Sequence, residues 1–158
     1  MSSEEWTDML YIGTDHGGFR LKEALLPWLE EQAISFYDEG TYSPVSCDYP
    51  LFSERVARAV QANKKHRGFL ICSSGVGMGI MANKFKGIYA ACLTTEKDAR
   101  KARQHNAINV LCVSGFIPTE CAQQMVHVFL TTEASMEERH IRRRQQILAL
   151  EGKMIHDA

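Results

Sequence analysis

Five short apolar runs alternate with longer amphipathic stretches along the chain. The apolar runs are typical of strands and cover residues 9–13, 34–40, 68–72, 87–93 and 109–115. Most of them lack the alternating polar positions of a strand that has one wet face. The pattern therefore predicts a sheet whose two faces are both covered.

Helical periodicity fills the intervals between these runs. The predicted helices cover residues 20–32, 49–64, 95–106, 118–130 and 135–152. Asp48 is the expected N-cap of the second helix and Pro50 lies in its first turn, whereas Pro27 should kink or shorten the first helix. Strand-then-helix units connect with a right-handed crossover, so we expect an α/β fold with a parallel sheet of about five strands. The length suits one domain, 1–158, with flexible ends at 1–8 and 153–158.

Composition and charge narrow the class of protein. The net charge of −1 gives no general electrostatic attraction to nucleic acid or to a membrane surface. No apolar run reaches the roughly 18 residues of a membrane helix. The five cysteines are odd in number and form no CxxC pair, which argues against structural zinc and against a disulfide framework. We therefore expect a cytoplasmic protein.

The stretch "LICSSGVGMGIMANK", residues 70–84, carries the clearest chemical signal. A strand ends on Cys72, passes Ser73 and Ser74, and is followed by glycines at 75, 77 and 79. In open parallel sheets, ligands bind beyond the carboxyl ends of the strands. "TDHGGF" (14–19) places Asp15 and His16 at the same edge, after the first strand.

Three interpretations of this loop compete. A dinucleotide loop requires a third glycine at position 80, where Ile80 stands, although Glu96 lies near the required acidic position. A P-loop is excluded, because no glycine precedes Lys84. A tight turn would make Cys72 a small buried hydrophobic residue. Alternatively, bare N–H groups at a helix start cradle an anion, and the same positive end activates the thiol as nucleophile or base.

Two later motifs add candidate ligands. "RQHNAIN" (103–109) places His105 and Asn106 just before the last strand. In "EERHIRRRQQ" (137–146), Arg139 and Arg143 share one helix face, opposite Ile141. That face is either simply solvated or grips one phosphate with two planar guanidinium groups.

Together these motifs resemble type B ribose-5-phosphate isomerase and its relatives that isomerise allose and galactose 6-phosphates. The resemblance spans about residues 9–151 and is carried by the five segments "TDHGGF", "DYP" (48–50), "LICSSGVGMGIMANK", "RQHNAINVLCVSG" and "EERHIRRRQQI". It implies a Rossmann-like three-layer α/β/α sandwich. It also implies an enzyme of the pentose phosphate pathway that interconverts D-ribose 5-phosphate and D-ribulose 5-phosphate, with no metal and no cofactor. By the same resemblance the protein is a homodimer, or a dimer of dimers, with shared active sites.

The resemblance also assigns roles. Cys72 is the base that moves a proton between C2 and C1, and His105, with Asp15 nearby, donates the proton that opens the furanose ring. The groups that hold the enediolate oxygens are the Ser74 side chain and the N–H groups of Ser73, Ser74, Gly75, Val76 and Gly77. Asn106 contacts the sugar hydroxyls. The phosphate is gripped by His16, Arg139 and Arg143.

Several positions depart from the family pattern. Phe116 stands where the family usually has an arginine that touches the ligand, so we expect one anchoring contact to be absent. Ala107 replaces an aspartate and Ser73 a glycine, while Met78 occupies the place of a glutamate base in another branch. Two other classes stay open: a cysteine hydrolase using Cys72, His105 and Asp15, and a non-catalytic module that binds sugar phosphates.

Overall fold

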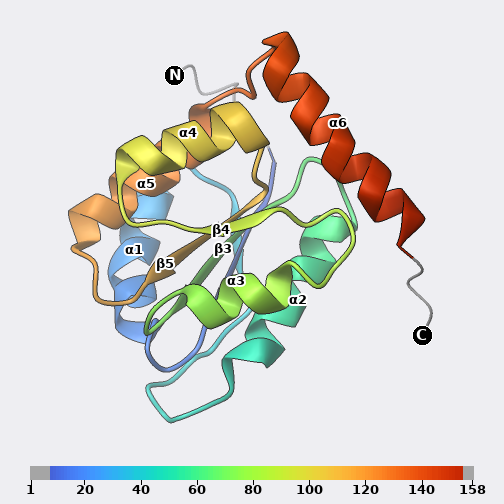
Figure 1. Cartoon of the computed structure of the whole chain (residues 1–158). Helices are drawn as coiled ribbons and strands as arrows, with labels where there is room; N and C mark the ends of the chain where they lie inside the picture. The colour runs from blue at the N-terminus through green and yellow to red at the C-terminus, as the bar shows by residue number, and fades with distance from the viewer. Residues whose placement is uncertain (1–7, 155–158) are drawn as a thin grey trace.

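A computed structural model describes residues 8–154 and builds them around one parallel sheet (Figure 1). Its strands, in the spatial order β2-β1-β3-β5-β4, are β2 (Phe36–Asp38), β1 (Leu10–Thr14), β3 (Arg67–Cys72), β5 (Val110–Ser114) and β4 (Ala90–Cys92). Every neighbouring pair is parallel. The predicted parallel sheet of about five strands is confirmed.

Helices cover both faces of this sheet. On one face lie α1 (Phe19–Glu31), α4 (Glu96–Asn106) and α5 (Thr119–Thr131). On the other lie α2 (Tyr49–Gln61) and α3 (Val76–Ala82). The last helix, α6 (Glu138–Lys153), runs along the outside, past the end of α4 (Figure 1). The arrangement confirms the three-layer α/β/α sandwich.

The apolar strands explain why both faces are covered. Side chains of successive residues point to opposite faces, so Phe69 and Ile71 pack under α1 and α5, while Leu70 and Cys72 pack under α2 and α3. All four side chains are buried. A strand that buries both faces needs a continuous apolar run, which is the pattern that the sequence shows.

The two edge strands are shorter than predicted. Expected at 34–40 and 87–93, they extend only over Phe36–Asp38 and Ala90–Cys92. Each pairs with a single neighbour over three residues. An apolar run at a sheet edge has a partner on one side only, so its length does not fix the length of the strand.

Pro27, which was expected to kink or shorten the first helix, does not shorten it. Helix α1 continues through Pro27 to Glu31, although a proline there removes a backbone hydrogen bond. Leu25 and Leu29 on either side of it are buried against the sheet, and this packing holds the helix together. Asp48 is the N-cap residue of α2, as predicted, although its side chain makes no capping hydrogen bond.

Helix α6 begins three residues later than predicted, at Glu138. The N–H of Ser135 donates to the Gln104 carbonyl, which keeps the preceding segment in a loop. Of the ends expected to be flexible, residues 1–7 and 155–158 lie outside the described part, and Lys153 is the last residue of α6. No helix within residues 8–154 is long and apolar enough to span a membrane.

Candidate active site

Three loops meet at the carboxyl edge of the sheet, because β1, β3 and β5 are adjacent. The N–H of Asp15 donates to the Ile71 carbonyl at 3.3 Å, and the N–H of Gly115 donates to the Cys72 carbonyl at 2.8 Å. The Ser114 hydroxyl donates to the Ser73 carbonyl at 2.6 Å. Backbone hydrogen bonds therefore fix the loop that carries Cys72 from both sides.

Glycines allow these loops to approach one another. A Cβ on Gly17 would lie 2.3 Å from the Ser73 hydroxyl oxygen, and one on Gly115 would lie 2.1 Å from the Gly17 carbonyl oxygen. Any side chain at either position would force the loops apart. Gly17, the first glycine of "TDHGGF", and Gly115 thus determine the shape of the edge.

The Cys72 thiol lies at the end of β3 and is 4% exposed. Its sulfur accepts a hydrogen bond from the Gly75 N–H at 3.1 Å. Gly75 has a φ of 80°, a left-handed conformation that favours glycine and turns the chain back toward the sulfur. The turn fixes the orientation of the thiol.

The loop's own contacts occupy part of the predicted N–H cradle. The Gly75 N–H points to the Cys72 sulfur, and the Val76 N–H donates to the Ser74 hydroxyl oxygen at 3.2 Å. The N–H groups of Ser73, Ser74 and Gly77 have no acceptor within the described residues. These three are available for an oxygen of a ligand.

A cavity of about 440 Å³ opens over this loop. We call its polar lining the thiol half-site: Asp15, His16, Tyr49, Cys72, Ser73, Ser74 and Gly77. Val76 and Ile80 complete the wall. Sequence analysis assigns no role in the site to Tyr49 or Ile80, although Tyr49 belongs to the "DYP" motif. A Cβ on Gly77 would lie 2.5 Å from the Tyr49 ring, so the ring rests directly on the loop.

Asp15 and His16 enter the cavity by different means. Asp15 is buried, and its Oδ1 accepts from the N–H groups of Gly17 at 2.8 Å and Gly18 at 3.2 Å. His16 is exposed, and its Nδ1 accepts from the Cys47 N–H at 3.2 Å. In the neutral imidazole the proton therefore sits on Nε2, which can donate to a ligand.

The loop that supplies the Cys47 N–H is anchored by a buried lysine that sequence patterns did not reveal. Lys22 on α1 is fully buried and pairs with both carboxylate oxygens of Asp38, at 3.0 and 2.9 Å. It also donates to the Thr41 carbonyl. A buried ammonium keeps its charge only where such partners surround it, so this contact ties the start of the loop to α1.

Other predicted site residues lie where α4 ends and α6 begins. His105 and His140 stack with ring centroids 4.2 Å apart and planes inclined by 8°. Arg139 donates to His140 Nε2 at 3.4 Å and pairs with Glu137 at 3.1 Å. We call His105, Asn106, Arg139, His140 and Arg143 the imidazole half-site. A cavity of about 270 Å³ beside it is lined by Gln104, His105, Glu133, Ser135, Glu137 and His140.

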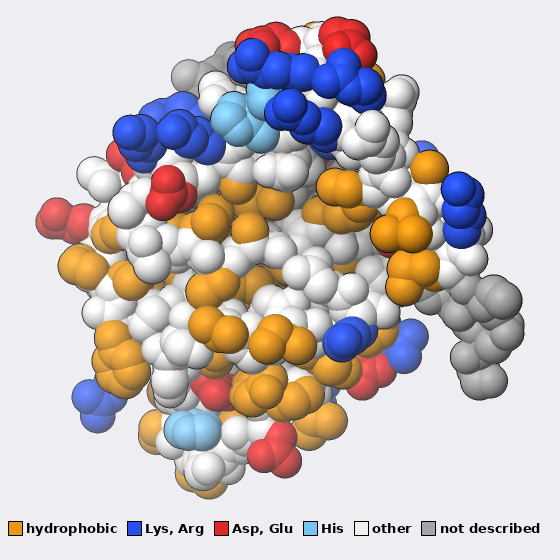
Figure 2. Space-filling view, viewed as in Figure 1, with side chains coloured by type: hydrophobic (Ala, Val, Ile, Leu, Met, Phe, Trp, Pro, Cys, Tyr) orange, Lys and Arg blue, Asp and Glu red, His pale blue; other side chains and the backbone are white. Residues whose placement is uncertain are grey.

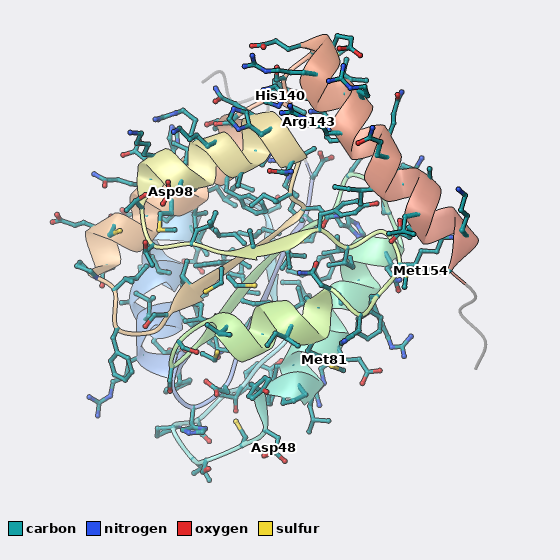
Figure 3. The ribbon with its side chains drawn as sticks, viewed as in Figure 1. Asp48, Met81, Asp98, His140, Arg143 and Met154 are labelled. Atoms are coloured by element: carbon teal, nitrogen blue, oxygen red, sulfur yellow. The ribbon has the colours of Figure 1, made fainter. Side chains whose placement is uncertain are left out.

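His140 carries no predicted role, and only its position beside Arg139 in the motif hints at one. Burial lowers its pKa from the ordinary value, and the neighbouring His105 and Arg139 lower the pKa further. The ring therefore favours its neutral form. Figure 3 shows His140 and Arg143 together beside the end of α4.

Arg144 joins the two helices that carry the imidazole half-site. Its guanidinium donates to the carbonyls of Ser135 at 2.8 Å, His105 at 3.2 Å and Gln104 at 3.5 Å. Three carbonyls at the end of α4 and before α6 thus share one cation. Nothing in the sequence distinguishes Arg144 from Arg142, which pairs instead with Glu138 on its own helix.

Within one chain the two half-sites are separate. The cavity over Cys72 includes neither His105 nor the arginines of α6. In Figure 3, Asp48, which adjoins Tyr49 in the chain, lies at the opposite end of the view from His140. Between these ends, hydrophobic side chains spread over the face that carries α3 and β4 (Figure 2). The structure thus assembles Asp15, His16 and the Cys72 loop, but not Cys72 with His105.

The side chains do not gather into a metal centre in the described part of the chain. No group of three or more His, Cys, Asp or Glu residues within 8–154 could hold a metal ion. The proposed dinucleotide loop also lacks its usual setting, since α3 has only seven residues.

Comparison with known proteins identifies the chain's family. The sequence profile described as Ribose/Galactose Isomerase matches residues 10–147. The chain belongs to this family. It is 39% identical over 143 residues to "Ribose-5-phosphate isomerase B" of Escherichia coli (strain K12), covering 90% of this chain and 95% of that protein.

Further relatives extend the comparison to structure and to another substrate. The "Ribose-5-phosphate Isomerase B from Mycoplasma genitalium with bound Ribulose-5-phosphate" superposes with a TM-score of 0.89 at 36% identity, covering 94% of this chain and 99% of that one. A family member from Clostridium sp. (strain MSTE9), 38% identical over 77% of both chains, is a "4-deoxy-4-sulfo-D-erythrose isomerase". The Ribose/Galactose Isomerase fold is therefore shared over nearly the whole chain.

Proposed function

We propose that the protein is an aldose-ketose isomerase that interconverts D-ribose 5-phosphate and D-ribulose 5-phosphate through an enediolate. The observation that carries the proposal is the thiol half-site, where a fixed Cys72 sulfur and unoccupied N–H donors line one cavity. Membership of the family supports the reaction class. The solved relative with bound ribulose 5-phosphate supports the choice of sugar.

In this mechanism Cys72 is the general base. The Cys72 thiolate takes the proton from C2 of the open-chain aldose, and the electron pair of that C–H bond forms the C1–C2 double bond of the enediolate. The carbonyl electron pair at C1 moves to O1, which gains a proton while the hydroxyl on O2 loses one. A lone pair of O2 then forms the carbonyl at C2, and the C1–C2 π pair takes the proton back from the thiol at C1, which gives the ketose. The N–H groups of Ser73, Ser74 and Gly77, with the Ser74 hydroxyl, hold the oxygens where negative charge develops.

The imidazole half-site would bind and open the sugar. His105 donates the proton to the ring oxygen of the furanose, Asp15 assists from the opposite side, and Asn106 contacts the hydroxyls. Arg139 and Arg143, together with the Nε2–H of His16, bind the phosphate. Planar guanidinium groups suit this task because they offer parallel donors to phosphate oxygens.

The two half-sites would then meet across a homodimer, or within a dimer of dimers. Three observations support this assembly. Cys72 and His105 face different cavities of one chain. Val76 and Ile80, beside the Cys72 cavity, are 53% and 59% exposed. Leu150 on α6 is also largely exposed. A second copy would cover this apolar surface and bring its own His105 to the thiol.

The five cysteines of the chain are all unpaired, so we place the reaction in the reducing cytoplasm. Phe116, 80% exposed after β5, stands where the family resemblance implies an arginine that touches the ligand, so one contact that would select the sugar is missing. Isomerisation of allose 6-phosphate or galactose 6-phosphate is therefore the second candidate.

The test is an isomerisation assay over ribose 5-phosphate, allose 6-phosphate, galactose 6-phosphate and 4-deoxy-4-sulfo-D-erythrose in deuterated water. We expect turnover to be fastest with ribose 5-phosphate, with deuterium incorporated at C1 of the ketose. A module that only binds would give affinity without proton exchange at C2. A cysteine hydrolase would instead give an acyl-enzyme that mass spectrometry detects.

A subunit-mixing experiment tests the shared site. Homodimers of Cys72→Ala and of His105→Ala should both be inactive. In a mixed dimer, one site carries both lesions and the other carries neither. Random reassociation makes about half of the dimers mixed, so about a quarter of wild-type activity should return. If mass spectrometry confirms exchange and no activity returns, the shared-site proposal is wrong.

A further inference from the structure

A second large cavity lies at the amino edge of the sheet, opposite the thiol half-site. It measures about 410 Å³, close to the size of the cavity over Cys72. It lies where Arg67 begins β3 and Asn109 precedes β5. We call it the amino-edge cavity. From α2, from the start of β3 and from the segment between them it is lined by Val60, Gln61, Lys64, His66 and Arg67. The remaining lining residues are Lys86, Gly87, Tyr89, Arg103, Ala107, Asn109 and Leu148.

All charged side chains of this lining are basic. They are Lys64, Arg67, Lys86 and Arg103, with His66 among them. No carboxylate lines the cavity, although the whole chain has 19 acidic residues against 18 lysines and arginines. A concave surface with charges of one sign concentrates the field and attracts counter-ions.

Arg103 carries its charge into the protein interior. Its side chain is 7% exposed and donates only to carbonyls, from Nε to Thr132 at 3.1 Å and from Nη1 to Ile108 at 2.6 Å. No carboxylate lies within ion-pair distance of it among residues 8–154. Burial, and to a smaller extent Arg144, lowers the pKa of Arg103, while Glu133 acts in the opposite direction without forming an ion pair with it. A buried cation without an anionic partner is costly, and a bound anion would offset that cost.

The neighbouring Arg67 increases the positive charge of the cavity. Burial, and then repulsion by Arg103, lowers the pKa of Arg67 to about 10, although Glu133 and Asp8 act in the opposite direction. Lys64 and Lys86 are exposed at the rim. The Gln61 side chain donates to the Lys86 carbonyl at 2.7 Å and so links the two segments that carry these lysines.

Part of the remaining lining is apolar or aromatic. Tyr89, Leu148 and Val60 contribute to it. The Tyr89 ring is fixed, because its hydroxyl donates to Glu151 at 2.9 Å and its N–H donates to the Asn109 side chain at 2.8 Å. The other Glu151 oxygen accepts from the Gly87 N–H at 2.6 Å. The carboxylate nearest to this wall thus has both oxygens engaged.

We propose that the amino-edge cavity binds a nucleoside phosphate with at least two negative charges. Its phosphates contact Lys64, Lys86 and Arg103, and its base lies against the Tyr89 ring. The volume is within the range of small-ligand sites. The site is distinct from both halves of the proposed active site. It lies at the other end of the strands from the thiol half-site, and no residue of the imidazole half-site lines it.

The test is calorimetric titration of ADP into the full-length protein that carries Arg139→Ala and Arg143→Ala, which removes the phosphate grip of the proposed active site. We expect saturable binding of one ADP per chain, and no binding of adenosine. Lys64→Glu with Lys86→Glu should weaken ADP binding by at least tenfold. Lys97→Glu with Lys101→Glu makes the same change of charge on α4, outside the cavity, and should leave the affinity within twofold.

Three results would overturn the proposal. If ADP does not bind, the cavity is not a nucleoside phosphate site. Equal weakening by both pairs of substitutions attributes the binding to net charge rather than to the cavity. If pyrophosphate binds as tightly as ADP, the base contributes nothing to affinity and does not bind against the Tyr89 ring. All four lysines are exposed, so the variants should fold, and their melting temperatures check this.

Discussion

The thiol half-site and the imidazole half-site are built in opposite ways. The first consists of strand ends joined by backbone hydrogen bonds, such as Gly115 N–H to the Cys72 carbonyl. The second consists of long side chains on the last turn of α4 and the first turns of α6, outside the sheet (Figure 1). The two helices are held together there by the stack of His105 on His140 and by the hydrogen bonds of Arg144.

This difference suits the two tasks that we propose. Proton transfer requires a base and oxyanion donors at fixed short distances, which a sheet edge supplies. Sugar phosphates differ in length and shape, and flexible arginines on an outer helix can follow them. We therefore expect substitution of Cys72 to change proton transfer, and substitution of the arginines of the imidazole half-site to change binding. His105→Ala should stop ring opening instead.

The largest effect should follow from Cys72→Ala. Loss of an essential general base lowers kcat by about 10²–10⁴. Cys92→Ser is the matched control: Cys92 is close to the same loop, with its sulfur 3.4 Å from the Ser74 carbonyl, but does not line the cavity. Steady-state kinetics should show near wild-type turnover for that control. If Cys72→Ala kept more than half of the wild-type kcat, Cys72 could not be the base.

The next effect concerns the phosphate. Arg139→Ala and Arg143→Ala should each raise KM for ribose 5-phosphate about tenfold or more, since each charge-assisted hydrogen bond contributes about 1.5–3 kcal/mol. Arg142→Ala, on the same turns of α6 but paired with Glu138, should change KM less than twofold. Unchanged KM in the Arg139→Ala, Arg143→Ala double variant would contradict the phosphate grip.

These two halves also differ in how far the sequence reveals them. The thiol half-site could be predicted because Cys72, Ser74 and Gly75 are contiguous and follow an apolar strand, so periodicity alone places them at the ligand-binding edge. Tyr49 was not assigned a role, since its contact with Gly77 depends on how α2 packs beside α3.

The imidazole half-site is harder to predict from the sequence. His105 and Arg139 were named from motifs, but the stack of His105 on His140 joins residues 35 positions apart on different helices. No sequence feature distinguishes Arg144 and Lys22 from other basic residues, because the periodicity of a helix does not show which lysine or arginine side chain is directed into the protein. Likewise, packing of Leu25 and Leu29 overrode the expected effect of Pro27.

A smaller effect tests whether Arg144 holds the second half together. Arg144→Met removes three hydrogen bonds to carbonyls while keeping an apolar stem, and should lower the free energy of unfolding by about 1–3 kcal/mol. Arg142→Met removes an exposed pair and should cost less than about 1 kcal/mol. Urea unfolding at one fixed protein concentration measures both. Equal losses would mean that the contacts of Arg144 do not stabilise the junction.

The smallest effect is a pH dependence that only the imidazole half-site should have. The pKa of His140 is lowered by burial, by His105, Arg139 and Arg143, and is opposed only by Glu137. The unfolded chain, with an ordinary histidine pKa of about 6.5, therefore binds more protons than the folded chain once the pH falls toward that value. The stabilisation is complete above about pH 6.5 and is lost as the pH falls through the lower folded pKa.

His140→Phe keeps a flat ring against His105 but cannot be protonated, so its urea midpoint should fall less than that of the wild type between about pH 7.5 and 5.5. Cys72→Ala leaves His140 and its neighbours in place, so this control should follow the wild-type slope. Parallel slopes for the wild type and His140→Phe would show that the stacked ring does not resist protonation.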